Sequence, residues 1–211
     1  MSDYRPSVLL DLDGTLVDSV FLHVVAWEAA LREAGHLVPM WRIHEGVGMG
    51  SSRLVPWLLG RHVEEASELA DEHERRFLEH ADQLQKTPGA SELIEDLQRR
   101  EVPFVIATSA TAKLGEALRE ALGAPDLPTA DADSVASPKP APDLLLSAVD
   151  KLGLAPEHAT LIGDSPWDGE AALACGVRFL AVRTGGFGDN RLLDGGASDV
   201  VDDPRALIGR L

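Results

Sequence analysis

The sequence contains little cysteine, few basic residues and no long hydrophobic run. Cys175 is the one cysteine among 211 residues, so an internal disulfide is excluded. Lysine and arginine number 19 against 35 acidic residues, and the net charge is −16. Nucleic acids and anionic membrane surfaces bind basic patches, so this charge argues against both as partners. The N-terminus lacks the apolar segment of a signal peptide, and we expect a cytoplasmic protein with no membrane-spanning helix.

Short apolar runs alternate with helical patterns through most of the chain. Hydrophobic residues make up 45% of it, enough to bury a core. The expected strands are 7–10, 104–107, 159–162, 179–182 and, more weakly, 200–201. The expected helices between them are 91–100, 112–122, 142–152 and 167–175. Continuous apolar strands that alternate with helices predict an α/β fold, a Rossmann-like parallel sheet covered on both faces.

The segment 17–85 breaks this alternation and has a helical pattern throughout. Apolar residues fall three or four apart over 20–34, a second helix opens at Ser52, and a third is expected over 63–84. The turn residues of 85–89 mark the return to the alternating pattern. We therefore predict a core of 1–16 and 86–211 with an inserted all-helical cap domain of 17–85. The Gly-rich stretch 185–196 is expected to be a loop.

Two carboxylates follow the first strand directly. Asp11 and Asp13 are two residues apart, and side chains alternate along a strand, so both project from the same side. Two like charges in that arrangement repel each other and are costly to desolvate. A hard divalent cation held by oxygen ligands would offset that cost. Gly14 then allows the chain to turn sharply beside the bound group.

Polar residues follow the later strands at the same predicted sheet edge. Thr108 and Ser109 follow 104–107, and Asp164 and Asp168 follow 159–162. Ligands of open parallel sheets bind beyond the carboxyl ends of the strands, so these side chains should converge. Four segments occur in order, namely Asp11-Leu12-Asp13-Gly14-Thr15, Val105–Ser109, Ser137-Pro138-Lys139-Pro140 and Ile162–Asp168. Together they resemble the haloacid dehalogenase superfamily of phosphohydrolases, over nearly the whole chain and including the helical cap.

The resemblance implies a reaction and two residues that perform it. Asp11 corresponds to the nucleophile that forms an aspartyl phosphate. Asp13 corresponds to the general acid that protonates the leaving alkoxide and then activates water. This second aspartate is absent from the dehalogenases proper, so its presence favours phosphoryl chemistry. If Asp13 acts as an acid, its pKa should be raised in the substrate complex.

The resemblance also implies how phosphate and metal are held. Thr108, Ser109 and Lys139 would bind the phosphate oxygens. Asp11, the backbone carbonyl of Asp13 and Asp164 would ligate Mg²⁺, for which Mn²⁺ or Co²⁺ could substitute in vitro. Asp168 would orient Lys139 or a metal-bound water. The implied partner is a small phosphorylated metabolite, a sugar phosphate or a compound like phosphoglycolate. The sequence leaves the oligomeric state open.

The cap carries candidate substrate contacts and the alternatives to hydrolysis. The loop 46–50 should face the core, with Gly48, Ser52 and Arg53 near the substrate, although Arg53 is equally explained as a solvated helix residue. His23 and Trp27 are similar to a histidine and a tryptophan of beta-phosphoglucomutase, which makes a phosphomutase the alternative function. Both residues are also explained by packing. A non-catalytic binding module is the third hypothesis. Phosphonate cleavage requires a cap lysine, and 17–85 contains none.

Overall fold

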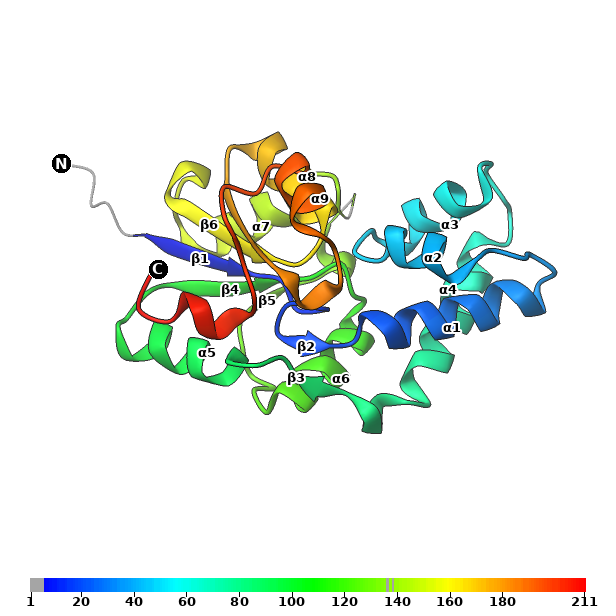
Figure 1. The fold of residues 1–211 in the computed structure, drawn as a ribbon, viewed down its shortest axis with the longest axis horizontal. Helices are drawn as coiled ribbons and strands as arrows, with labels where there is room; N and C mark the ends of the chain where they lie inside the picture. Colours follow the sequence, from blue (N-terminus) through cyan, green and yellow to red (C-terminus); the bar gives the residue numbers. More distant parts are fainter. Residues whose placement is uncertain (1–5, 136, 138) are drawn as a thin grey trace.

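The computed structural model describes residues 6–135, 137 and 139–211, and within them a parallel sheet forms the core (Figure 1). Its six strands lie in the order β5-β4-β1-β6-β7-β8. They are β5 Thr129–Ala130, β4 Phe104–Ala107, β1 Ser7–Leu10, β6 Ala159–Gly163, β7 Arg178–Val182 and β8 Val200–Val201. Leu9 in β1 pairs with Val105 on one side and Leu161 on the other. The predicted α/β fold is confirmed.

Helices cover both faces of this sheet. Val8 and Leu10 pack with α5 (Ala90–Arg99) and α6 (Ala112–Leu122) in one buried cluster. Leu9 points to the other face and packs with α7 (Asp143–Leu152), α8 (Pro166–Cys175) and α9 (Asp189–Asp194). The alternation of side chains along β1 therefore gives the sheet two apolar faces, which is why its strands are continuous apolar runs.

Four helices lie between two short antiparallel strands, β2 (Val17–Asp18) and β3 (Gln85–Lys86). They are α1 Val20–Glu33, α2 Met40–Gly46, α3 Ser51–Leu59 and α4 Ala66–Leu78, followed by a 3-10 turn at Ala81–Gln83. Figure 1 shows these helices on one side of the molecule, beyond the sheet, with β2 and β3 where the chain passes between the sheet and the helices. Their buried side chains form a third cluster around Trp27 and Leu54. We propose 17–85 as the limits of this cap.

Several short elements differ from the prediction. The helix expected over 63–84 ends at Leu78, and α2 was not expected at all. In α2 only Ile43 and Gly46 are buried, too few to produce a helical periodicity. The stretch 185–196 contains α9, which is anchored by the buried Leu192 and was wrongly expected to be a loop. Strands β2, β3 and β5 have two residues each, too short for any alternation.

None of the helices in the described ranges is long and apolar enough to cross a membrane. The expected cytoplasmic location stays a prediction.

The side chain of Phe77 joins the cap to the core. It lies on α4, is 0% exposed and belongs to the cluster under α5 and α6. Truncation in Phe77→Ala should lower the free energy of unfolding by about 3–5 kcal/mol, because burial is lost and a cavity is left. Urea titrations followed by circular dichroism measure this. Trp41→Ala, at a side chain 63% exposed, should change stability by no more than about 0.5 kcal/mol. Equal effects of the two substitutions would contradict this role for Phe77.

The carboxylate of Asp96 fixes the C-terminal residues against α5. It accepts hydrogen bonds from the Gly209 N–H at 2.9 Å and from Arg100 at 3.0 Å, which lower its pKa. A lowered pKa stabilises the fold above the ordinary carboxyl range, and the gain is lost as pH falls through the folded-state value. Asp96→Asn should therefore melt below wild type at pH 7, with the difference shrinking towards pH 3. Scanning calorimetry against pH tests this. Asp126→Asn, at an exposed residue, is the control, and its melting temperature should follow that of wild type across the pH range.

Candidate active site

The carboxyl ends of three neighbouring strands bring the predicted polar residues to one edge of the sheet. Asp11 follows β1, Thr108 follows β4, and Asp164 follows Gly163 at the end of β6. Asp11 is 6% exposed, Asp164 is 4% exposed and Thr108 is fully buried. Because β1 pairs in parallel with both β4 and β6, the three residues that follow these strands lie side by side.

Lys139 is the buried cation of this edge. Its Nζ lies 2.5 Å from Asp11 Oδ1 and 2.7 Å from Asp168 Oδ1. Burial alone would lower the pKa of Lys139, but the two carboxylates raise it above its ordinary value. Asp168 is itself fixed, because its Oδ2 accepts hydrogen bonds from the N–H of Ser165 at 3.0 Å and from its Oγ at 2.5 Å. The bond from the Ser165 N–H, together with the bond from the Asp168 N–H to Ser165 Oγ at 3.4 Å, forms the capping box that starts α8.

Asp164 lies beside Asp11 and shares a donor with it. The hydroxyl of Thr15 is 3.0 Å from Asp164 Oδ1 and 3.3 Å from Asp11 Oδ2. Burial raises the pKa of Asp11 to about 7, against the opposing effect of Lys139. Burial and the charge of Asp11 raise the pKa of Asp164 well above its ordinary value. Two adjacent carboxylates in this environment resist ionising together.

The donor set fits a hard divalent cation. Asp11, Asp164 and Asp168 are all buried, and each offers an oxygen within 4.8 Å of the others. Carboxylate oxygens are the ligands that Mg²⁺ prefers, and a dication would remove the obstacle to ionising Asp11 and Asp164 together. Asp13 contributes no side-chain oxygen to this cluster.

Two glycines leave room for the carboxylate of Asp164. A Cβ on Gly185 would lie 1.8 Å from Asp164 Oδ2, and one on Gly14 would lie 2.4 Å from the same atom. Gly14 also has a φ of +72°, a conformation that favours glycine. Sequence reasoning missed Gly185 and Thr15. Thr15 stands in the motif with Asp11 and could have been found there, whereas Gly185 is recognisable only from the folded chain.

Asp13 turns towards the cap. Its Oδ1 accepts a hydrogen bond from Ser19 Oγ at 2.7 Å and lies 2.8 Å from His23 Nε2. Burial would raise the pKa of Asp13, but His23 and Ser19 together bring it below its ordinary value. The increase in the pKa of Asp13 that we expect applies to the complex with substrate. Without substrate, its neighbours lower the pKa of Asp13.

His23 and Trp27 both have partners within the cap. His23 Nδ1 lies 2.9 Å from His73 Nε2, and the His73 ring stacks on Trp27 with centroids 4.1 Å apart. Burial, followed by the charge of His23, lowers the pKa of His73 well below its ordinary value. Trp27 is therefore explained by packing, while His23 contacts both Asp13 and the cap interior.

The two predicted phosphate-binding hydroxyls differ. Thr108 Oγ1 accepts a hydrogen bond from the N–H of Ala110 at 3.1 Å, which orients the residues after β4. The Oγ of Ser109 is buried and has no hydrogen-bond partner among the described residues. Ser109 also lines the cavity between core and cap, so its hydroxyl is available to a ligand there.

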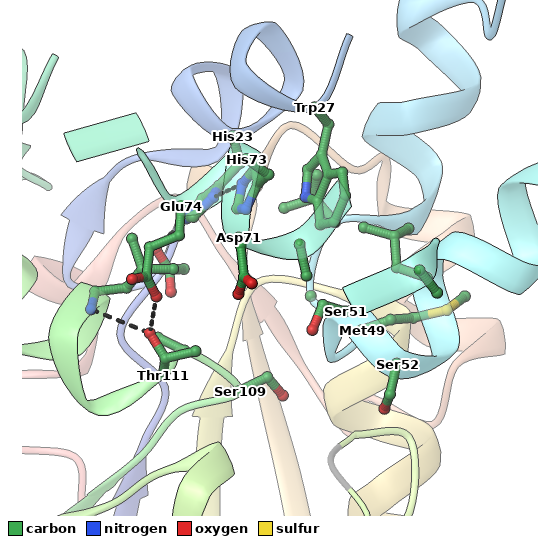
Figure 2. A pocket seen from close by; sticks show the side chains of 18 of the residues that line it. His23, Trp27, Met49, Ser51, Ser52, Asp71, His73, Glu74, Ser109 and Thr111 are labelled. Atoms are coloured by element: carbon green, nitrogen blue, oxygen red, sulfur yellow. Dashed lines mark hydrogen bonds and ion pairs between the residues drawn. The ribbon is translucent and has the colours of Figure 1, made fainter. Parts of the chain in front are cut away.

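A cavity of about 430 Å³ lies over Asp11 and Asp13, between the core and the cap (Figure 2). Of the predicted substrate contacts, His23, Gly48 and Ser52 line it. Arg53 is exposed and does not line it, so the structure favours the interpretation of Arg53 as a solvated helix residue.

The cap loop that begins after α2 sits on the core. The N–H of Gly50 donates to the carbonyl of Lys139 at 3.3 Å, and Trp167 Nε1 donates to the carbonyl of Glu45 at 3.0 Å. His44 Nε2 donates to the carbonyl of Gly185 at 2.9 Å. His44 and Glu45 belong to α2, whose last residue is Gly46, and Gly50 lies in the stretch between α2 and α3. The stretch 46–50 contacts the core through Gly50, which agrees with the expectation that it faces the core.

Comparisons with known proteins agree with this geometry. The family model of haloacid dehalogenase-like hydrolases matches residues 7–176. A phosphoglycolate phosphatase of Chromobacterium violaceum is 33% identical over 85% of this chain and 85% of its own length. Hexitol phosphatase A of Escherichia coli is 32% identical over 82% of this chain and 81% of its own. A hydrolase of Pseudomonas syringae has a solved structure that superposes with a TM-score of 0.94, at 33% identity, covering 98% of this chain and 97% of its own. The chain therefore belongs to the haloacid dehalogenase-like hydrolases.

Proposed function

We propose that this protein is a Mg²⁺-dependent phosphatase that hydrolyses a small phosphomonoester through an aspartyl phosphate. One observation carries the proposal: Asp11 stands between Lys139 and Asp164 at the floor of the cavity, with Asp13 beside it. The relatives named phosphoglycolate phosphatase and hexitol phosphatase support a phosphorylated small molecule as substrate.

In the first half-reaction, Asp11 attacks phosphorus and the bond from phosphorus to the leaving oxygen breaks. Asp13 gives its proton to that oxygen, which departs as an alcohol. In the second half-reaction, Asp13 takes a proton from water, the water oxygen attacks phosphorus, and inorganic phosphate and free Asp11 result. Lys139 and the hydroxyl of Ser109 offset the charge of the phosphoryl oxygens.

Asp11, Asp164 and the backbone carbonyl of Asp13 would hold the metal. Mg²⁺ bound there would neutralise phosphate charge and so allow an anionic nucleophile to approach. Asp168 keeps Lys139 in place through their ion pair of 2.7 Å.

A phosphomutase remains the alternative, and the contact of His23 with Asp13 is the observation that favours it. A mutase passes the phosphoryl group between two oxygens of a sugar through a bisphosphate. Product analysis separates the two functions, because a phosphatase releases inorganic phosphate and a mutase yields an isomer without release.

Removal of the Asp11 carboxylate should abolish turnover. Asp11→Asn keeps the size of the side chain but lacks the nucleophilic charge, so phosphate release should fall by roughly 10³-fold or more. Release from a panel of phosphorylated metabolites, with Mg²⁺ and with chelator, measures this. Asp18→Asn, at an exposed aspartate of β2, should leave the rate unchanged. Full turnover by Asp11→Asn would refute the proposed nucleophile.

A methyl group at Gly185 should weaken metal binding. Its Cβ would displace the Asp164 carboxylate, and we expect the affinity for Mg²⁺ or Mn²⁺ to fall about 10–100-fold, as for groups that position metal ligands. Isothermal titration calorimetry without substrate measures the change. Gly188→Ala is the matched control, because a Cβ there meets nothing within 4 Å. Unchanged affinity in Gly185→Ala would remove Asp164 from the proposed ligands.

A further inference from the structure

The wall of the cavity formed by helix α4 is acidic. Asp71 and Glu74 both line the cavity, and a spacing of three residues puts them on one face of the helix. Figure 2 shows their side chains projecting from α4 towards the loop that carries Ser109 and Thr111. We call this pair the acidic wall. Among the described residues that line the cavity, none is lysine or arginine.

The two carboxylates of the acidic wall differ in their partners. Glu74 accepts a hydrogen bond from Thr111 Oγ1 at 2.6 Å and forms an ion pair with Lys113 at 3.1 Å. Asp71 makes no hydrogen bond or ion pair with any described residue. Asp71 is exposed, and its carboxylate is available to an occupant of the cavity without an ion-pair partner among the described residues.

The buried cation of the site is not part of the cavity lining. Lys139 contacts Asp11 and Asp168 and is 1% exposed, so it serves the phosphate position and does not line the cavity. A substrate whose phosphate sits over Asp11 extends its leaving group into the space beside Asp71. A second anionic group there would meet Asp71 with no lysine or arginine in the described lining to pair with. Such like-charge juxtaposition is disfavoured.

We propose that the acidic wall selects a phosphate ester whose leaving group is an uncharged polyol or sugar, and that Asp71 excludes leaving groups carrying a carboxylate or a second phosphate. This inference rests on the proposed function and names the substrate class of the same site.

The rest of the lining suits such a leaving group. Ser51, Ser52 and Ser67 line the cavity, and their hydroxyls can both donate to and accept from the hydroxyls of a polyol. The carboxylates of Asp71 and Glu74 accept hydrogen bonds from hydroxyl groups. The apolar side chains of Met49 and Leu54 can cover the carbon-bound hydrogens of the polyol chain.

The test compares two esters that differ in a single group. Glycerol 3-phosphate carries a CH₂OH group where 3-phosphoglycerate carries a carboxylate. Wild-type protein should hydrolyse glycerol 3-phosphate with a kcat/KM at least about tenfold higher. Asp71→Lys should reduce this preference by about tenfold or more, mostly by raising kcat/KM for 3-phosphoglycerate. Glu68→Lys makes the same charge change on an exposed residue of α4 that does not line the cavity, and it should leave the preference unchanged.

The outcomes separate this inference from the proposed function. Hydrolysis of 3-phosphoglycerate or 2-phosphoglycolate at least as fast as of the polyol phosphates would overturn the inference and leave the phosphatase intact. If Asp71→Lys keeps the wild-type preference for glycerol 3-phosphate over 3-phosphoglycerate, the inference is likewise overturned and the phosphatase stays intact. A preference for phosphoethanolamine over polyol phosphates would show that the acidic wall selects a cation, and would also overturn it. Absence of hydrolysis with every ester would refute the proposed function itself.

Discussion

The constraint on which the site depends is the burial of three carboxylates around one ammonium group. Asp11, Asp164 and Asp168 are each at most 6% exposed. Among the described residues the one buried lysine beside them is Lys139, which contacts Asp11 and Asp168. Charges removed from water are costly unless they are paired, and one lysine cannot neutralise three acids. The raised pKa values of Asp11 and Asp164 express this imbalance. A divalent cation and a phosphate, bound together, would change the balance of positive and negative charge around Asp11.

The parallel sheet makes this concentration of charge possible. Asp11 and Asp164 each stand just beyond a strand whose apolar residues fill both faces, so the stability of the core holds these carboxylates together against their repulsion. Asp168 belongs instead to the first turn of α8, where its bonds to Ser165 hold it rigidly against Lys139. The same aspartate thus caps a helix and orients the lysine, so the structural and the functional interpretations of Asp168 are compatible.

The sequence predicted what depends on local order and missed what depends on distant contacts. The strand segments 7–10, 104–107, 159–162 and 179–182 and the helices expected between them have strong patterns, and so has the motif around Asp11. The contact of His23 with His73 joins residues 50 apart, and the close approach of Gly185 to Asp164 joins different loops. Neither leaves a periodic signal, because each arises only when separate elements pack. For the same reason Arg53 was a reasonable candidate in sequence, although in the folded chain it is exposed and does not line the cavity.

Asp13 connects the chemistry of the core to the position of the cap. Its carboxylate contacts Ser19 and His23, which lie at the start of the cap, while its backbone follows β1, as does that of Asp11. A displacement of α1 relative to the sheet would therefore alter the hydrogen bonds of Asp13 directly. Closure of a cap over an active site excludes water and completes the set of reacting groups. In this chain the group proposed to donate the proton is therefore oriented by Ser19 and His23 at the start of the cap.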